Sequence, residues 1–421
     1  MRCRPELAPA AWRYCSANQL VQQGLQLIEA GLLDNGRMAD LAARLGVGER
    51  QLRRLFQQEL GVAPLQVALN RRLLFAKQLL HDSHLPITDI ALAAGFGSVR
   101  RFNDAWQKSF GLNPTQLRRT QEQASSSGQG LTLRLAYRPP YDFSAMLDFL
   151  RRRAIAGVEV CTEQQYARVV HDGLGHCGWI TVSDIPGRCE LRVALHRLMP
   201  RQIFRVLRGV RQLFDIDADS EQIEAHLQTD PALVSRLQAT PGIRVPGCID
   251  GFEIAVRAVV GQQVSLAAAR TLIGRIIQRC GGDLPQALEP GLERRFPTPV
   301  ELAQADLSDC GLTTARQHSL RTLAQAVVDE QVSLEPTQRL EHFLQAWQQL
   351  PGIGPWTAHY LAMRVLHHPD AFPAGDLILR RALVDKQGAP VEHSEAALRR
   401  YSERWRPWRA YAALLLWHHS N

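Results

Sequence analysis

Residues 350–376 read LPGIGPWTAHYLAMRVLHHPDAFPAGD, and the fold expected for the C-terminal part of the chain depends on this stretch. Glycines at 352 and 354 separate two runs with helical periodicity, LEHFLQAWQQL (340–350) and PWTAHYLAMRVL (355–366). Glycine accepts positive φ and has no Cβ, so a Gly-x-Gly turn lets the backbone approach a ligand closely. Because the first amides of the second helix are unpaired and lie at the positive end of its dipole, we expect this ligand to be an anion such as phosphate.

Asp376 follows a Pro-Ala-Gly turn and directly precedes the run LILRRALV. Taken alone, an Asp at this place is interpreted as a helix N-cap. A phosphate-binding hairpin followed by an Asp at the end of a loop resembles the helix-hairpin-helix DNA glycosylases, whose motif ends in Gly, Pro and Asp. LPGIGPWTAHYLAMR (350–364) and RYSERWRPWRAYAALLLW (400–417) are similar to segments of the AlkA-type 3-methyladenine DNA glycosylases. The resemblance implies that Asp376 is catalytic, with N-capping as a compatible second role.

Length, composition and charge distribution limit the class of protein. A chain of 421 residues exceeds one ordinary domain, and its 45% hydrophobic residues can supply several cores. Residues 1–120 hold 16 Lys and Arg against 9 Asp and Glu, so they carry nearly all of the net charge of +8. A basic N-terminal module indicates nucleic-acid binding. The apolar runs are too short for a membrane span and the N-terminus has no apolar signal core, so we expect a cytoplasmic protein.

Residues 16–119 are expected to be all-helical and to contain two helix-turn-helix units. MADLAARLG leads into ERQLRRLFQQEL, and ITDIALAAGFG leads into SVRRFNDAWQKSF, with RRLLFAKQLL as the joining helix. This tandem arrangement resembles the AraC-type DNA-binding domain, especially its Ada-type members. The second helix of each unit would enter the major groove, although any single exposed Arg is more often a solvated or phosphate-contacting residue. Six residues are the candidate DNA contacts: Arg50, Gln51, Arg54, Ser98, Arg100 and Arg101.

The cysteines predict free thiols and no metal cluster. Eight are scattered without a Cys-x-x-Cys pair, and none follows Cys310, which excludes a C-terminal four-cysteine iron–sulfur cluster. RCRPELAP near the start resembles the end of the four-cysteine zinc domain of Ada-type proteins, with Cys3 matching its last ligand. One cysteine cannot build a tetrahedral zinc site, so we expect residues 1–15 to be a remnant, through a late start or loss of the sensor, and no bound zinc.

TQEQASSSGQG (120–130) is small, polar and without periodicity, so it is interpreted as a linker. From 131 to 240 we expect a small α+β domain: LTLRLAY, GWITVS and ELRVALH are predicted strands and YDFSAMLDFLRRR a helix. YRPPYDFSAMLDFL resembles the opening of AlkA-type enzymes, which implies that Phe149 lines the base pocket. The sequence GLGHCG (173–178) matches a dinucleotide fingerprint but precedes a strand pattern rather than a helix, so nucleotide cofactor binding is rejected.

Residues 241–421 are expected to form an all-α domain. The long helical pattern GFEIAVRAVVGQQVSLAAARTLIGRIIQR is interrupted at GQQVS. In the family that it resembles, the side chain two positions after this Gly enters the duplex where the base has left, which implies that Gln263 is the wedge. That wedge is often aliphatic, and a polar Gln supplies less apolar contact but can hydrogen-bond the orphaned base.

Three aromatic residues are the candidate walls of a base pocket. Trp356 and Tyr360 are four residues apart on one predicted helix, hence on one face, and Trp417 matches a pocket position of the family. Their alternative interpretation is ordinary core. Alkylation at purine N3 or N7 makes the base cationic, and aromatic rings attract such a cation. The family has an aromatic residue after the catalytic Asp, whereas this chain has Leu377.

The chemistry expected of the site is hydrolysis by one carboxylate. A cationic purine leaves readily, so the task of Asp376 is to stabilise the oxocarbenium charge on the sugar and to orient or deprotonate water. Glycosylases of this superfamily that also cut the backbone have a Lys where Trp356 stands. No Schiff-base nucleophile is available there, which predicts a monofunctional enzyme.

The resemblance also implies roles for backbone groups and for one further arginine. The DNA-phosphate hairpin would comprise Gly352, Ile353, Gly354 and Thr357. A monovalent cation would be held by the backbone carbonyls of Gln348, Leu350 and Ile353, and no other cofactor is required. Arg409 is expected to orient the site or face DNA near the pocket, with a surface salt bridge as the alternative.

The sequence therefore predicts a multidomain, mainly α protein: an all-α tandem helix-turn-helix domain, a small α+β domain and an all-α helix-hairpin-helix glycosylase domain. The expected function is a bifunctional adaptive-response protein, in which a transcription regulator is joined to an enzyme that excises alkylated purines. Its expected partners are alkylated and promoter double-stranded DNA and RNA polymerase, and a monomer is expected. The alternative is a regulator whose glycosylase half is a degenerate DNA-binding platform; Gln263 and Leu377 are the departures that favour it.

Overall fold

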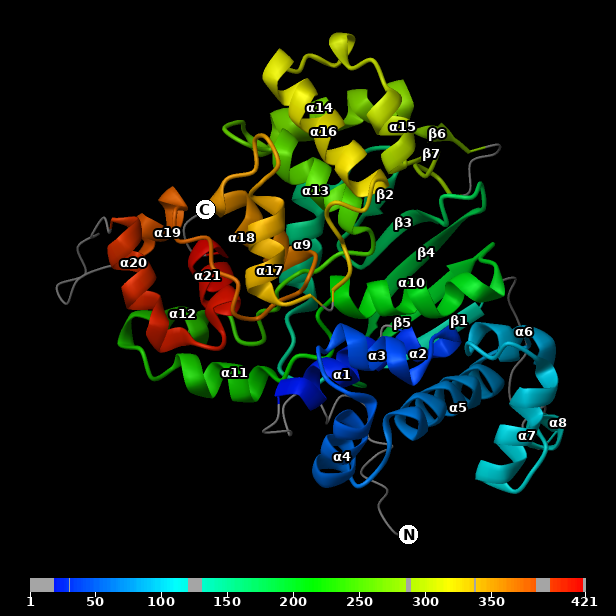
Figure 1. Ribbon diagram of the computed structural model, residues 1–421. Coiled ribbons are helices and arrows are strands. Elements are labelled where there is room, and N and C mark those ends of the chain that lie inside the picture. The colour runs from blue at the N-terminus through cyan, green and yellow to red at the C-terminus, as the bar shows by residue number, and fades with distance from the viewer. Residues whose placement is uncertain are drawn as a thin grey trace. The chain divides into compact units, whose positions relative to one another are not determined.

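The computed structural model describes residues 19–29, 31–119, 131–284, 289–336, 338–383 and 394–418 (Figure 1). The expected zinc-domain remnant and the linker at 120–130 lie outside these residues. The chain forms two compact units. One comprises the described residues up to Arg134 together with Ala194–Arg208, and the other comprises Leu135–Val193 and the described residues from Gly209 onward.

The N-terminal unit begins with eight helices among the described residues, coloured blue to cyan in Figure 1. α3 and α4 form the first helix-turn-helix unit, α6 and α7 form the second, and α5 is the joining helix, as expected. These helices are α1 (Gln19–Glu29), α2 (Leu32–Asn35), α3 (Met38–Arg44), α4 (Glu49–Leu60), α5 (Pro64–Asp82), α6 (Ile87–Ala93), α7 (Val99–Phe110) and α8 (Pro114–Arg119).

Burial in α4 and α7 follows the period of an α-helix. Leu52 and Phe56 of α4, like Phe102 and Trp106 of α7, are buried, because residues four apart share a face. Both helices end at a glycine in the left-handed conformation, Gly61 after α4 and Gly111 after α7. Such a glycine stops a helix without the cost that a Cβ would add.

A five-stranded sheet of order β1-β5-β4-β3-β2 forms the predicted α+β layer. β2 pairs with β3 and β3 with β4 in antiparallel register. β4 begins at Cys177, within GLGHCG, so this motif leads into a strand, as the sequence predicts. The elements of this layer are β1 (Leu131–Ala136), α9 (Phe143–Arg153), β2 (Glu159–Cys161), β3 (Gln165–His171), β4 (Cys177–Ile185), β5 (Glu190–His196) and α10 (Pro200–Leu213).

The rest of the larger unit is helical, apart from one short two-stranded ribbon, and its helices carry the site. Most begin at an Asp, Ser or Thr whose side chain accepts a first-turn amide, among them Asp250 before α13 and Ser265 before α14. These elements are α11 (Ser220–Leu227), α12 (Pro231–Ala239), α13 (Gly251–Val260), α14 (Leu266–Cys280), β6 (Gly282–Asp283), β7 (Arg294–Arg295), α15 (Pro299–Gln304), η3 (Ser308–Cys310), α16 (Thr314–Val328), α17 (Leu340–Trp347), α18 (Pro355–Arg364), α19 (Leu377–Ala382), α20 (Glu395–Tyr401), η4 (Ser402–Trp405) and α21 (Arg409–His418).

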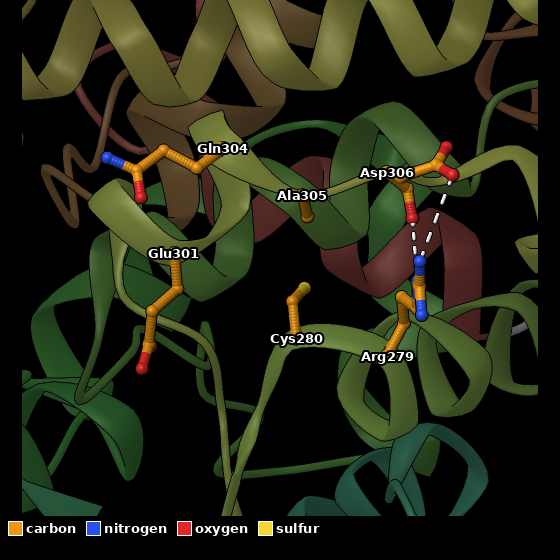
Figure 2. A pocket seen from close by; sticks show the side chains of 6 residues that line it. All are labelled: Arg279, Cys280, Glu301, Gln304, Ala305 and Asp306. Carbon is orange, nitrogen blue, oxygen red and sulfur yellow. Dashed lines mark hydrogen bonds and ion pairs between the residues drawn. The ribbon is translucent and has the colours of Figure 1, made fainter.

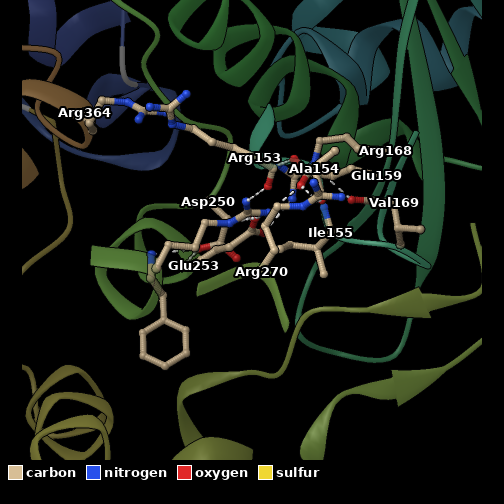
Figure 3. Close-up of polar contacts among 12 residues, drawn as sticks. Arg153, Ala154, Ile155, Glu159, Arg168, Val169, Asp250, Glu253, Arg270 and Arg364 are labelled. Atoms are coloured by element: carbon tan, nitrogen blue, oxygen red, sulfur yellow. Dashed lines mark hydrogen bonds and ion pairs between the residues drawn. The ribbon is translucent and has the colours of Figure 1, made fainter. Parts of the chain in front are cut away.

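A buried ion network joins the sheet to α13 (Figure 3). Arg168 Nη2 of β3 lies 2.6 Å from Glu253 Oε2, and Arg257 Nε donates to Glu253 Oε1 at 2.8 Å. Arg257 also pairs with Glu159 of β2 and donates from Nη1 to the carbonyl of Arg153 at 2.7 Å. Each buried charge thus meets an opposite charge, which fixes α9, the sheet and α13 against one another.

No helix among the described residues is long and apolar enough to cross a membrane. The six cysteines in the described ranges are free thiols, as expected. Within the same ranges, no group of three or more His, Cys, Asp or Glu is arranged to hold a metal ion. The expectation about zinc concerns Cys3, which lies outside them.

Candidate active site and DNA interfaces

The predicted hairpin between α17 and α18 is present. The Leu350 amide donates to the Trp347 carbonyl and the Ile353 amide to the Leu350 carbonyl, each at 3.1 Å, so the chain reverses in two consecutive tight turns. Gly352 has φ +81°, and a Cβ there would lie 2.6 Å from Ser319 Oγ, so both the conformation and the space require glycine. Gly354 is the N-cap of α18, is exposed, and has nothing within 4 Å of the place of a Cβ. The backbone here is open to a ligand.

Two members of the predicted phosphate hairpin turn their side chains inward. Ile353 is 4% exposed and Thr357 is 2% exposed. The Thr357 hydroxyl accepts a hydrogen bond from Gln262 Nε2 at 2.9 Å. Any contact of these two residues with phosphate would therefore be through the backbone.

The Asp376 carboxylate is half-buried and accepts three N–H hydrogen bonds. Oδ1 accepts from the Leu379 amide at 3.0 Å, which makes Asp376 the N-cap of α19, and from Trp417 Nε1 at 3.0 Å. Oδ2 accepts from Trp356 Nε1 at 2.9 Å. A carboxylate has about four acceptor positions, so one remains for a water molecule or for the sugar. Capping and a catalytic role are compatible at this residue.

The predicted aromatic residues come together around this carboxylate. The rings of Trp356 and Tyr360 are nearly parallel, with 5° between their planes and centroids 5.5 Å apart. Tyr360 and Trp417 meet at 61° with centroids 6.5 Å apart. All three side chains are half-buried. Leu377 is 49% exposed and lies outside this arrangement.

Phe149 of α9 reaches the aromatic cluster through an arginine. Arg364 Cζ lies 5.0 Å from the centroid of Phe149, and Arg364 Nη1 donates to the Tyr360 hydroxyl at 2.8 Å. Arg153 Cζ lies 3.7 Å from the same Phe149 centroid. The sequence reasoning missed both arginines, although the position of Arg364, eight residues after Trp356 on one helix face, was a signal.

The turn between α13 and α14 presents Gln263 to solvent. Gln263 is exposed and has φ +56°, an unusual backbone conformation for a residue with a Cβ. The neighbouring Gln262 side chain donates to the carbonyl of Gly352 at 2.7 Å as well as to Thr357. Arg316 Nη2 donates to the Gln262 carbonyl at 2.6 Å. The turn is thereby attached both to the hairpin and to α16, a function of Gln262 and Arg316 that sequence reasoning did not find.

Arg409, expected to orient the site or to face DNA, is buried in an ion pair. Its side chain is 8% exposed, and Nε and Nη2 donate to the two oxygens of Asp370 at 2.7 and 2.9 Å. This is a buried, bidentate ion pair, neither a surface salt bridge nor a DNA-facing group. Together with the hydrogen bond from the Ala410 amide to the Pro369 carbonyl at 2.8 Å, it fastens the loop before Asp376 to the start of α21.

The candidate contacts in the helix-turn-helix units are exposed. Arg50, Gln51 and Arg54 lie on the face of α4 opposite to Leu52 and Phe56. Ser98 caps α7, since its hydroxyl accepts from the Arg101 amide at 3.3 Å. Arg100 and Arg101 are exposed at the start of α7. The structure therefore leaves these side chains accessible at the beginning of each second helix.

A hollow of about 350 Å³ lies at the end of α14 (Figure 2). It contains none of the predicted site residues. Its one ion pair, Arg279 to Asp306 at 3.8 Å, is exposed, as usual for a surface depression. The lining residues are Arg279, Cys280, Glu301, Gln304, Ala305 and Asp306.

Comparisons with known protein families agree with this geometry. Residues 41–120 match a helix-turn-helix domain, residues 132–250 match the AlkA N-terminal domain, and residues 256–407 match the HhH-GPD superfamily of base excision DNA repair proteins. A carboxylate held by two indoles beside a glycine hairpin thus lies in a helix-hairpin-helix base-excision domain.

The chain matches two curated relatives over most of the length of each relative. The chain is 36% identical over 420 residues to the "Probable bifunctional transcriptional activator/DNA repair enzyme AlkA" of Mycobacterium tuberculosis, covering 99% of this chain and 83% of the relative. It is 35% identical to "DNA-3-methyladenine glycosylase 2" of Escherichia coli, covering 68% and 96%. A solved 3-methyladenine DNA-glycosylase from Archaeoglobus fulgidus, 20% identical, shares the fold with a TM-score of 0.58 over 68% of this chain and 97% of that one. The chain belongs to the AlkA family, in the branch that joins an AraC-type helix-turn-helix domain to a DNA glycosylase.

Proposed function

We propose that this DNA glycosylase is monofunctional and releases alkylated purines from double-stranded DNA, leaving an intact abasic site. The observation that carries the proposal is the Asp376 carboxylate, which accepts from the indoles of Trp356 and Trp417 while one acceptor position stays open. The hairpin amides would hold the phosphate backbone, and the extruded base would lie against the aromatic rings. Gln263 would fill the gap in the duplex.

The proposed reaction breaks the bond between the sugar C1′ and the purine nitrogen. The electron pair leaves with the base, which neutralises an alkylated cationic purine. Asp376 stabilises the positive charge that develops on the sugar and accepts a proton from the water that adds to C1′. Trp356 stands where a lyase would need Lys, so no covalent intermediate with DNA forms.

Release of free base from methylated duplex DNA, compared between the wild type and Asp376→Asn, tests this proposal. Asn is as good an N-cap as Asp, so the variant keeps α19 and removes the charge. We expect release of 3-methyladenine to fall by about two to four orders of magnitude, the range typical of a positioned acid–base group. Absence of release by the wild type, with DNA binding intact, would support the alternative of a regulator with a degenerate glycosylase platform. A borohydride-trapped protein–DNA adduct would contradict the monofunctional reaction.

The N-terminal unit would bind promoter DNA through Arg50, Gln51, Arg54, Ser98, Arg100 and Arg101, and act on transcription with RNA polymerase, as a monomer. The exposure of these residues on α4 and α7 supports the proposal. An Arg that reads guanine supplies about 1 to 3 kcal/mol of discrimination. Footprinting on the protein's own promoter, with Arg50→Ala and Arg100→Ala, tests it.

The hairpin would bind a monovalent cation through the carbonyls of Gln348, Leu350 and Ile353. The two consecutive turns curl this segment, and the Leu350 carbonyl, which accepts from the Ile353 amide, keeps a second lone pair. Such an ion would add positive charge beside a bound phosphate. Replacing potassium and sodium by tetramethylammonium at constant ionic strength is expected to weaken binding to abasic-site DNA.

A further inference from the structure

The loop that leads to Asp376 is buried but irregular. Residues 365–375 connect α18 to Asp376 without a helix or strand, and residues 370–374 are all buried. Buried backbone amides need acceptors, and here the regular hydrogen bonds of helices and sheets do not supply them. The groups that accept from these amides therefore determine the conformation of the loop, and with it the place of the Asp376 carboxylate.

Two amides of this loop donate to imidazole nitrogens. The Phe372 amide donates to His359 Nδ1 at 3.3 Å, and the Asp370 amide donates to His368 Nδ1 at 3.2 Å. His359 belongs to α18, whereas His368 belongs to the loop itself. A ring nitrogen accepts a hydrogen bond only in a neutral imidazole, so both rings must be uncharged for the loop to keep this conformation.

The surroundings of His359 keep its ring neutral. Arg399 of α20 and Arg409 of α21 act on it, together with their carboxylate partners Glu395 and Asp370. Burial has the largest effect on the pKa of His359, the two arginines lower it further, and the two carboxylates oppose them, which leaves this pKa at about 4. At pH 7 the imidazole is therefore an acceptor and not a cation.

Two overlapping tight turns connect Phe372 to Asp376. The Phe372 carbonyl accepts from the Ala374 amide at 3.0 Å, and the Pro373 carbonyl accepts from the Asp376 amide at 2.9 Å. These hydrogen bonds leave little freedom between the amide that His359 holds and the residue that carries the carboxylate. A displacement of Phe372 would therefore displace Asp376 as well.

α18 holds Asp376 by two routes. Trp356 donates from Nε1 to Asp376 Oδ2 at 2.9 Å. His359 lies three residues after Trp356, hence on the same side of the helix, and accepts from the Phe372 amide. The buried ion pair of Arg409 fastens an earlier part of the loop to α21, so it does not fix the segment next to the carboxylate against the indole.

We propose that His359 is a positioning residue for base excision. Its neutral imidazole holds the Phe372 amide and thereby keeps the Asp376 carboxylate at its two indole donors. This inference rests on the proposed glycosylase function. An apolar side chain in place of the acceptor leaves a buried amide without a partner, which favours another conformation of the loop. Because His359 acts through Asp376 and not on the DNA, its loss should slow the chemical step without weakening binding.

The test compares His359→Leu, which removes the acceptor, with His359→Asn, whose Oδ1 can take the place of the imidazole Nδ1. Steady-state and single-turnover release of 3-methyladenine from methylated duplex DNA gives kcat and KM for each variant. We expect His359→Leu to lower kcat about 10- to 100-fold, with KM within about twofold of the wild type. His359→Asn should restore kcat to within about threefold of the wild type, because it restores the acceptor.

His176→Leu is a matched control. The His176 ring also makes a hydrogen bond, to Asp172 Oδ2 at 2.9 Å, but it is exposed in the turn between β3 and β4. This variant should change neither kcat nor KM.

The indole N–H resonances of Trp356 and Trp417 report the position of the carboxylate without any activity. They are recorded in ¹⁵N-labelled protein free of DNA and are assigned through Trp356→Phe and Trp417→Phe. Both signals are expected to shift in His359→Leu and to return in His359→Asn. His368→Leu, which removes the other imidazole acceptor of the loop, provides a second variant in case His359→Leu does not fold. It is expected to lower kcat and to shift the signals in the same direction, and near-ultraviolet circular dichroism checks the fold of each variant.

A folded His359→Leu variant with the kcat of the wild type would overturn the inference alone. Equal losses of kcat in the Leu and Asn variants, or unchanged indole signals in the Leu variant, would do the same. If the wild type released no base while the indole signals moved as expected, the proposed function would fail, and the hold of His359 on Asp376 would stand.

Discussion

At Asp376, two tryptophans each contribute a hydrogen bond and a ring. Trp356 Nε1 and Trp417 Nε1 donate to different oxygens of the carboxylate, while their rings stand beside Tyr360. Together with the Leu379 amide, they hold the carboxylate in one orientation from three points. Positioning of this kind lowers an activation barrier because the group does not need to reorganise during the reaction.

Trp417→Phe separates the two contributions, since phenylalanine keeps an aromatic wall and loses the N–H. A hydrogen bond to a charged group contributes about 1.5 to 3 kcal/mol. We therefore expect kcat for 3-methyladenine release to fall by about 10- to 100-fold with little change in KM, whereas Trp417→Ala should also raise KM. Steady-state and single-turnover kinetics of both variants check this. A Phe variant with wild-type kcat would show that the indole N–H has no part in catalysis.

The residues of the site differ in how far sequence reasoning could find them. Trp356 and Tyr360 are one helical turn apart, so their common face follows from the period of the helix. Trp417 and Phe149 could be identified only through the family resemblance, because nothing in the sequence around either residue indicates that it lies near Asp376. Arg364 was missed because its neighbours Phe149 and Arg153 come from α9. The partner of Arg409 was not predicted because Asp370 lies in an irregular loop.

At the scale of elements, the turn that carries Gln263 and the hairpin at 352–354 form one connected piece. Gln262 joins them by donating to the Gly352 carbonyl and to Thr357 Oγ1, and Arg316 holds the turn from α16. The left-handed conformation of Gln263 costs on the order of 1 kcal/mol, which these contacts offset. The interruption at GQQVS was evident from the sequence, but its attachment to the hairpin depends on tertiary structure.

Gln262→Ala should therefore weaken extrusion of the base more than hydrolysis. We expect base release from a fully paired duplex to fall about tenfold, since loss of the contacts allows the turn to relax. Release from a mismatched or single-stranded lesion should fall less, because less unpairing energy is needed. Gln325→Ala on α16 is a matched control, since this Gln also makes a side-chain hydrogen bond, to Asp329 at 2.8 Å, but is exposed and distant in sequence from the turn. An equal decrease on paired and unpaired substrates would contradict the role assigned to Gln262.

At the scale of the whole molecule, the buried ion network that joins the sheet to α13 makes the free energy of unfolding depend on pH. Burial alone would raise the pKa of Glu253, but Arg168 and Arg257 outweigh it and lower this pKa from an ordinary 4.5 to about 2. A carboxylate with a lowered pKa contributes stability that is complete above about pH 4.5 and is lost as the pH falls through about 2. The network thus favours the folded state across the neutral range.

Glu253→Gln should lower the free energy of unfolding of the larger unit at pH 7 by about 3 to 5 kcal/mol, because it leaves buried arginines with too few partners. The difference from the wild type should shrink between pH 4.5 and pH 2. Urea denaturation across this range measures it. Asp283→Asn, which removes an exposed carboxylate 2.7 Å from Arg294, should change stability by less than about 1 kcal/mol. A difference for Glu253→Gln that is independent of pH would rule out the ion network as its origin.

The two activities of this chain depend on different residues, which allows them to be separated. Arg50 and Arg100 are exposed on α4 and α7, whereas the proposed catalytic residues lie on α18, at the N-cap of α19 and on α21. The double variant Arg50→Ala/Arg100→Ala should weaken promoter binding by about 1 to 3 kcal/mol per base-reading arginine, and should lower the salt dependence if either contacts phosphate. Its rate of 3-methyladenine release under single-turnover, saturating conditions should equal that of the wild type, because the proposed chemistry at Asp376 uses none of these side chains. Asp376→Asn should show the reverse, with intact promoter binding and little base release. If the arginine variant also lost base release at saturation, the helix-turn-helix unit would have to take part in holding the damaged duplex. The assignment of the two activities to separate sets of residues would then be wrong.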